Sequence, residues 1–301
     1  MPEVLPICAP LPADSDNGGR KKGARPAPVQ LESGLGHATF ALDGNNTRVV
    51  SVGSRAPLQL LAPRVAGEVG WLVMGSLGGG LLGGDHLRME LTVQSWARAY
   101  VTTQASTKIY KSGNCGCARQ NLTVHIGPHA ALIFAPDPVV CFAQSDYRQE
   151  QNFHLDGTGS LLAVDWFTSG RWHRAERWNF TRYFNRQSFY INGNAILRDS
   201  IDMDNTVRGF SAGIGMNRVN ALATVVCLGP LFTRSAGTML QRLHDIPIHP
   251  KENIMFGSSK LADGFILRVA GDSAEHVGRF LHVELAEVAR AMGVQLWSRK
   301  W

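Results

Sequence analysis

Between residues 58 and 192 the chain alternates short apolar runs with turn-forming residues, and this pattern limits the fold more than any other feature. The runs are rich in Val, Thr, Ile, Phe, Tyr and Trp, and Gly, Asn, Asp or Pro interrupts them. Such residues favour extended backbone, and turn formers mark the ends of strands. The runs that we assign to strands are Leu58–Ala62, Trp71–Leu77, Leu87–Val93, Ala99–Ala105, Leu122–Ile126, Ala130–Phe134, Leu161–Thr168 and Ser188–Asn192. We therefore predict a mainly β protein, not an alternation of strands and helices.

Two segments near the end of the chain have helical periodicity instead. Apolar residues recur at helical spacing in Phe232–Leu243 and again in Ala274–Met292. Asp272 and Ser273 provide a cap for the second segment, and Gly293 provides a stop. The sequence therefore predicts a β body with two α-helices in its C-terminal half.

Strand spacing by itself does not separate the β architectures. A β-solenoid, in which the chain coils, fits the spacing, but a sandwich and a barrel fit it as well. The tripeptide Ala-Asp-Gly joins Asn253–Lys260 to Gly264–Ala270, so an antiparallel hairpin is expected there. No internal repeat is evident that would decide between the architectures.

The length and composition fit a folded body behind a polar tail. With 301 residues and 44% hydrophobic side chains, the chain can bury a sizeable core. Residues 1–33 are rich in Pro, Gly, Asp, Ser and Lys and lack apolar periodicity, which predicts a disordered tail. The folded domain is expected to span residues 34–301.

Charge and cysteine content bear on partners and compartment. The net charge of +6 is a modest basic excess, and the tight basic cluster Arg20-Lys21-Lys22 lies in the tail, so nucleic acid is not an expected partner. The segment that starts at Met1 does not resemble a secretory signal, and no apolar run approaches the ~18 residues that span a membrane. The five cysteines are odd in number and unevenly spread, which suits a reducing compartment. We expect a cytoplasmic protein without a membrane partner.

A glycine-rich segment, Gly78–Gly83, fits the G-x-G-x-x-G pattern of dinucleotide sites. Such a site needs a helix to begin there, because the pyrophosphate binds helical N–H groups. The apolar residues that follow are Leu87, Met89, Leu91 and Val93, which have the period of a strand. We therefore interpret the glycines as a turn where backbones approach closely.

The polar run Thr102–Tyr110 lies between strand-like residues and has two interpretations. In a half-buried strand its hydroxyls would bond to neighbouring strands. Alternatively, its Thr and Gln side chains line a wet internal channel and contact a hydrated cation.

The segment Cys115-Gly116-Cys117 offers two thiols on a turn. Thiolates are natural ligands for borderline metals such as nickel and zinc. A closed zinc site usually has two pairs of ligands, each pair closely spaced in the sequence. Only this pair is present, so no structural metal is expected. Cys115 and Cys117 are either ordinary surface thiols or a transient metal contact.

Asp137 and Glu176 are the two carboxylates that could act as acid and base in glycoside hydrolysis, a reaction that some β-solenoids catalyse. A simpler interpretation pairs Glu176 with Arg171 or Arg174. No G-x-S-x-G elbow, H-E-x-x-H helix or Walker loop occurs in the sequence. The chain is therefore predicted not to be an enzyme, with a carbohydrate hydrolase as the alternative.

From about Gly34 to the C-terminus, the chain resembles the urease accessory protein D family, particularly its plant and fungal members. Four ordered elements carry the resemblance: Gly78–Asp85, Thr102–Tyr110, Pro136–Phe142 and Ser169–Trp178. Ala175 departs from the glycine that the family commonly has before the glutamate, which affects only the transfer of a role to Glu176.

The resemblance implies a β-solenoid with two late helices that works as a scaffold in urease maturation. It implies complexes with urease and with the urease accessory proteins F and G, of which G is the GTPase. Nickel insertion would then require passage of Ni2+, with no tightly bound cofactor. A conduit should hold the cation weakly at several points. The candidate residues for metal transit are Asp85, Thr103, Gln104, Asp137 and Glu176.

Overall fold

The computed structural model describes residues 34–65, 67–207, 216, 218–247 and 252–298, and the account below concerns these residues. They belong to a single compact unit, Leu31–Trp301. The predicted disordered tail, residues 1–33, lies outside the described residues, so that part of the domain division stays a prediction.

The first of two β-sheets, sheet A, has the strand order β14-β13-β11-β8-β5-β1-β2. Strands β1, β5, β8, β11 and β13 pair in parallel, and β2 and β14 add antiparallel hairpins at the two sides. The strands are β1 (Leu35–Asp43), β2 (Asn46–Ser54), β5 (His86–Val93), β8 (Ala118–Ile126), β11 (Asp146–Leu155), β13 (Arg182–Ile191) and β14 (Asn194–Asp204).

Sheet B has the main order β16-β17-β15-β12-β9-β6-β4-β3, with β7 and β10 forming a side branch next to β12. Its parallel strands are β4, β6, β9 and β12, and antiparallel strands flank them. The strands are β3 (Leu58–Leu61), β4 (Gly70–Ser76), β6 (Arg98–Thr103), β7 (Thr107–Ile109), β9 (Ala131–Phe134), β10 (Val139–Cys141), β12 (Ser160–Thr168), β15 (Ala221–Leu228), β16 (Ile254–Leu261) and β17 (Gly264–Gly271). The predicted hairpin is β16 with β17.

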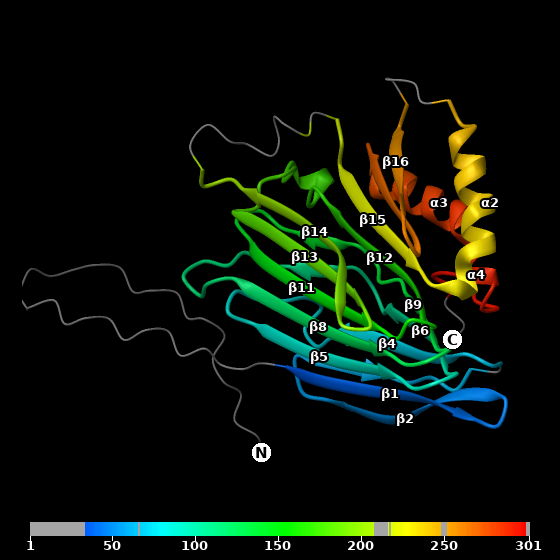
Figure 1. Ribbon diagram of the computed structural model, residues 1–301. Helices are drawn as coiled ribbons and strands as arrows, with labels where there is room; N and C mark the ends of the chain where they lie inside the picture. The colour runs from blue at the N-terminus through cyan, green and yellow to red at the C-terminus, as the bar shows by residue number, and fades with distance from the viewer. Residues whose placement is uncertain (1–33, 66, 208–215, 217, 248–251, 299–301) are drawn as a thin grey trace, which may run out of the picture. The chain divides into compact units, whose positions relative to one another are not determined.

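The chain crosses from sheet B to sheet A four times in succession, from β4 to β5, β6 to β8, β9 to β11 and β12 to β13. Parallel strands need a crossover between them, and here each crossover is a strand of the opposite sheet. Successive turns therefore stack in register, as in a solenoid (Figure 1). The predicted β-solenoid body is confirmed, and the sandwich and barrel alternatives are excluded.

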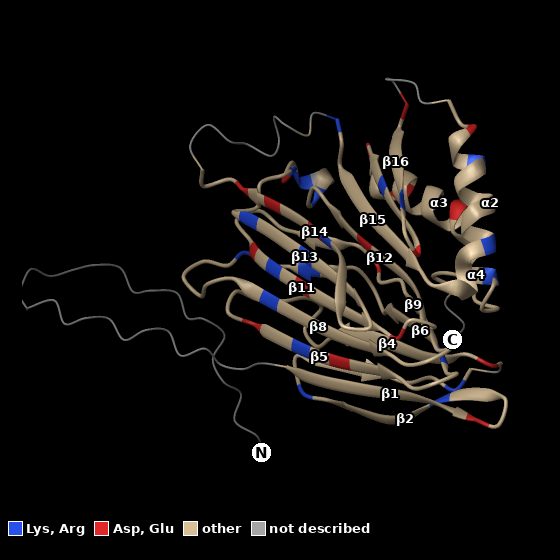
Figure 2. Cartoon of the chain, in the orientation of Figure 1, with Lys and Arg blue, Asp and Glu red and all other residues tan. Residues whose placement is uncertain are grey.

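The buried hydrophobic residues form two separate cores. In β5, Leu87, Met89, Leu91 and Val93 point inward and are buried, whereas the alternating positions 88 and 90 are exposed. Figure 2 marks charged residues in blue and red along the strands of sheet A. Strand β12 is buried along its whole length, because one face packs toward sheet A and the other toward the helices. The larger core therefore fills the solenoid, and a second core lies outside sheet B.

The helices that cover sheet B are α2 (Thr233–His244), α3 (Ala274–Glu284) and α4 (Ala286–Arg290). Of two short 3-10 turns, η2 (Pro230–Phe232) directly precedes α2, and η1 (Trp172–Arg174) follows β12. The three α-helices lie beside β15–β17 (Figure 1). The Ser273 Oγ accepts a hydrogen bond of 3.1 Å from the His276 N–H, which is the expected cap. The second predicted helix is interrupted at Leu285, and α4 packs against α2 with Val288 buried. No helix in the described part of the chain is long and apolar enough to cross a membrane.

Leu132 tests the central core, because this β9 side chain is fully buried between the sheets. We expect Leu132→Ala to lower the free energy of unfolding by about 3 kcal/mol through lost burial and a residual cavity. Urea denaturation would show this loss as a lower unfolding midpoint at an unchanged m-value. The control Val50→Ala, at an exposed position of β2, should change stability by less than about 0.5 kcal/mol. Equal midpoints for the two variants would contradict the assigned core.

Candidate functional site

The four loops that lead from sheet B to sheet A lie on one edge of the solenoid, and we name this the motif edge. The loops are residues 77–85, 104–117, 135–145 and 169–181. Each contains all or most of one of the four sequence elements singled out above. Parallel turns in register place equivalent loops directly above one another, so elements about thirty residues apart in the sequence become neighbours.

Backbone hydrogen bonds join the loops of the motif edge into a short ladder. Leu81 forms a parallel bridge with Ile109, and β7 pairs in parallel with β10. The Tyr110 N–H donates to the Leu81 carbonyl at 2.9 Å, and the Phe142 N–H donates to the Ile109 carbonyl at 2.9 Å. The motif edge is therefore a hydrogen-bonded surface and not a set of independent loops.

Two glycines allow the first two loops to touch. A Cβ at Gly80 would lie 2.5 Å from the Lys108 carbonyl oxygen, and a Cβ at Gly83 would lie 2.6 Å from the Ser112 carbonyl oxygen. Any side chain there would push the loops apart. Strand β5 follows the glycines, and no helix begins there. The interpretation as a close-approach turn is confirmed.

Thr103 and Asp137 form a direct pair between neighbouring loops. The Thr103 Oγ1 donates to the Asp137 Oδ2 at 3.0 Å, and the Asp137 N–H donates to the Thr103 Oγ1 at 2.7 Å. The adjacent Thr102 Oγ1 donates to the Ala135 carbonyl at 2.8 Å. For Thr102 and Thr103, the interpretation as strand hydroxyls bonded to their neighbours therefore holds, and Thr103 also borders a cavity.

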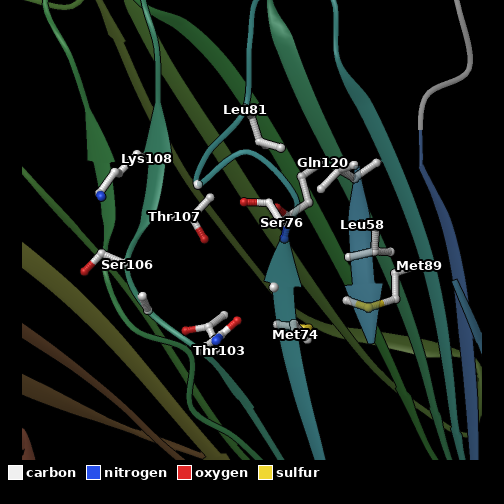
Figure 3. A pocket seen from close by; sticks show the side chains of 15 residues that line it. Leu58, Met74, Ser76, Leu81, Met89, Thr103, Ser106, Thr107, Lys108 and Gln120 are labelled. Atoms are coloured by element: carbon white, nitrogen blue, oxygen red, sulfur yellow. The ribbon is translucent and has the colours of Figure 1, made fainter. Parts of the chain in front are cut away.

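That cavity, of about 160 Å³, opens beneath the motif edge between the two sheets (Figure 3). It is large enough for several water molecules. Polar side chains from loop 104–117 border it together with apolar side chains from the strands. The principal lining residues are Thr103, Gln104, Ser106, Thr107, Lys108 and Gln120 on the polar side and Leu58, Met74, Leu81 and Met89 on the apolar side.

A buried polar cluster continues inward from the cavity, and sequence reasoning missed it. The Tyr147 hydroxyl lies 3.3 Å from Gln120 Oε1 and donates at 2.8 Å to Gln149 Oε1. The Gln149 amide donates to Asp165 Oδ1 at 2.6 Å, and the Asn185 amide donates to Asp165 Oδ2 at 2.7 Å. We call these five residues the interior polar cluster. Because Gln120 also lines the cavity, the cluster is continuous with the motif edge.

Asp165 is the ionisable member of the cluster. Burial raises the pKa of Asp165 to about 6, although the hydrogen bonds from Gln149 and Asn185 act in the opposite direction. Its two oxygens accept hydrogen bonds from the neutral side-chain amides of Gln149 and Asn185. The solenoid therefore holds a carboxyl group whose charge changes in the mildly acidic range.

Glu176 is held in an ion pair on the motif edge. The Arg171 Nε donates to Glu176 Oε2 at 2.8 Å, a second contact joins the other nitrogen and oxygen, and the Ala143 N–H donates to Oε2 at 3.2 Å. The bond from Arg171 lowers the pKa of Glu176. The Arg171 guanidinium also lies 4.0 Å from the centre of the Phe142 ring. Of the two predicted partners, Arg171 is the one observed, and Glu176 ties loop 169–181 to loop 135–145.

Asp85 lies beside the two cysteines at the first turn of the motif edge. Its Oδ2 accepts from the Leu82 N–H at 2.8 Å, and the neighbouring Gly84 N–H donates to the Cys117 carbonyl at 3.3 Å. The Arg119 Nε lies 3.1 Å from the Cys117 sulfur. Neither Cys115 nor Cys117 is part of a disulfide, and Cys115 is exposed. Within the described ranges, no group of three or more His, Cys, Asp or Glu could hold a metal ion.

The predicted transit residues therefore form three neighbouring groups. Thr103 and Asp137 bond to each other, and Gln104 lines the same cavity. Asp85 lies with Cys115 and Cys117, whereas Glu176 is bound to Arg171. A role in metal transit stays a prediction for all of them, and the interior polar cluster is the addition that the structure makes.

The fold and this edge define a β-solenoid protein whose distinctive residues are gathered on stacked loops. The family model described as UreD urease accessory protein matches residues 33–300. This chain therefore belongs to the urease accessory protein D family, and its role is in urease maturation.

Named relatives agree with the family model. A urease accessory protein UreD from Anaeromyxobacter sp. (strain Fw109-5) is 39% identical over 274 residues, covering 90% of this chain and 91% of the relative. Urease accessory protein D from Oryza sativa subsp. japonica is 30% identical, covering 89% and 96%. A protein from Schizosaccharomyces pombe named as an uncharacterized urease accessory protein ureD-like is 31% identical, covering 62% and 68%.

The raised pKa of Asp165 makes a prediction about stability and pH. The charged carboxyl is more costly in the folded than in the unfolded state, so its favourable contribution is present below pH 4 and is lost as the pH rises through 6. Between pH 4 and pH 7, the free energy of unfolding of the wild type should fall by on the order of 2 kcal/mol more than that of the Asp165→Asn variant. Urea unfolding across this range would measure the difference. The exposed control Asp43→Asn should show none, and a constant Asp165→Asn difference would contradict the burial argument.

Proposed function

We propose that this chain is a non-enzymatic scaffold that binds urease and the urease accessory proteins F and G, and that its solenoid offers Ni2+ a polar passage toward apo-urease. The observation that carries this proposal is the continuity between the motif edge, the cavity and the interior polar cluster. GTP hydrolysis would belong to protein G. No cofactor would be tightly bound, and the complex would act in the cytoplasm.

The motif edge has the character of a protein-binding face. Trp172 is 57% exposed, and Leu77 and Leu82 are exposed on the same edge. Large apolar and aromatic side chains dominate the binding energy of many interfaces when a partner buries them. The backbone hydrogen bonds between the loops hold the segments that carry these side chains in a fixed conformation. Less conformational entropy is therefore lost when a partner docks. These features support partner binding at the motif edge.

The interior supports weak, repeated contact with a cation. The groups along the proposed passage are hydroxyl, amide and carboxyl oxygens, from Thr103 and Gln104 at the cavity to Asp165 inside. Such oxygens hold a borderline cation less tightly than a thiolate cage does, so the ion can leave again. The buried Tyr183 hydroxyl, which has no hydrogen-bond partner within the part of the chain described, adds a further oxygen.

The loop carboxylates would act at the outer part of the route. Asp137 lies beside Thr103 at the cavity, and Asp85 and Glu176 lie on neighbouring turns of the motif edge. Cys115 and Cys117, next to Asp85, would make a transient contact with the ion before it enters. This arrangement supports a sequence of weak sites and not a single tight one.

The alternative function, a carbohydrate hydrolase, receives little support from the same residues. A glycosidase general acid needs a raised pKa so that it is protonated at work. Arg171 instead lowers the pKa of Glu176, and Asp137 is engaged with Thr103. The scaffold is therefore the better explanation of this edge.

The most direct test is to co-express urease with its accessory proteins, with and without this chain. The scaffold hypothesis expects urease made without it to contain little nickel and to be inactive. Nickel per active site would be measured by mass spectrometry and activity by ammonia release. Fully nickel-loaded, active urease in the absence of this chain would refute the proposal.

Asp137→Asn tests the passage separately from assembly, because the amide keeps the size of the side chain but removes its charge. We expect binding to the partner proteins to be unchanged and the nickel content of urease to fall roughly tenfold. Affinity capture and metal analysis would measure the two quantities. Asp43→Asn, on the β1–β2 hairpin, is the matched control and should behave as wild type. Wild-type nickel loading with Asp137→Asn would remove this residue from the route.

A further inference from the structure

Two histidines lie side by side on the outer face of sheet A, at the edge opposite the motif edge. His125 near the end of β8 pairs directly with His154 near the end of β11 in the parallel register. Their imidazole rings are stacked, with centroids 5.2 Å apart and an interplanar angle of 17°. Tyr190 of β13 stacks on the other side of His154 at 4.6 Å. The parallel ladder therefore fixes both imidazoles side by side at the surface.

The surroundings of the pair are open and polar. The His125 side chain is 48% exposed, and the Glu90 carboxylate oxygen lies 3.8 Å from its Nε2. Both histidines border a surface hollow of about 600 Å³, together with Thr92, Gln94 and Asp156. An ion from solvent can therefore reach the imidazoles, and acidic groups stand nearby to compensate its charge.

The chemistry of two adjacent imidazoles favours a borderline divalent cation. Neighbouring strands lie about 4.8 Å apart, and metal–imidazole bonds are about 2 Å long, so rotation of the two stacked rings about their side-chain bonds would let both reach one ion. Neutral imidazole is the form that binds metal.

We propose that His125 and His154 form a surface site for one divalent cation of the Ni2+, Cu2+ or Zn2+ class, with water in the remaining positions. Glu90 acts as an outer partner that accepts a hydrogen bond from His125 or from a bound water. Two protein ligands make an exchangeable site and not a structural one. The site is remote from the cysteines and from the interior polar cluster, and it does not depend on the proposed nickel passage.

Titration of the full chain with Ni2+ tests the site. The reference is the Cys115→Ser, Cys117→Ser variant, which removes the competing thiols. We expect His125→Ala and His154→Ala, each made in that reference, to weaken one Ni2+ site at least roughly tenfold, and Glu90→Gln to weaken it less. His282→Ala, at an exposed position of α3, is the matched control and should bind as the reference does. Calorimetry would give the number of sites and their affinities.

A second measurement needs no substitution of either histidine. Electron paramagnetic resonance of Cu2+ bound to the reference protein should show coupling to two imidazole nitrogens. A spectrum with no such coupling at one equivalent, or Ni2+ binding that is unchanged by the His125→Ala, His154→Ala double substitution, would overturn the proposal. Either result would leave the proposed role in urease maturation untouched.

Discussion

The structure depends on parallel, in-register hydrogen bonding between successive turns of the chain. Each turn contributes one strand to sheet A and one to sheet B. The same backbone hydrogen bonds that join the strands within each sheet therefore also stack the connecting loops. A shift by one residue would move every inward side chain to the outer face. Register therefore fixes both the apolar core and the positions of the loops, and the motif edge is a direct consequence of it.

Close stacking restricts which residues the loops can contain. Glycine at positions 80 and 83 allows backbone contact that a Cβ would block. Glu176 and Arg171 contact Ala143 and Phe142 of the preceding loop, which ties the last two loops together. These residues belong to recognisable sequence elements, yet their observed contacts are mainly between turns of the protein itself. The groups on this edge that remain exposed to a partner include Trp172, Leu77 and Leu82, and the oxygens around the cavity remain for a cation.

Polar groups inside the solenoid carry a cost that the structure offsets by hydrogen bonding. Removal of a carboxyl group from water is unfavourable, and the amides of Gln149 and Asn185 compensate it only in part, as the raised pKa of Asp165 shows. An apolar core would be simpler and more stable at that place. A polar interior next to a cavity is what the proposed Ni2+ passage would require.

The sequence by itself determined the β class, the helical segments and the four elements that identify the family, because strand periodicity, helical periodicity and short motifs are local properties. It did not determine where the helix after Ala274 would be interrupted, or that the four elements would share one edge. It also did not reveal the interior polar cluster, since β11 and β13 have polar residues at both inward and outward positions and periodicity could not choose the buried face. Only the tertiary structure decided these points, because they depend on strand register and on which neighbouring turn removes each side chain from water.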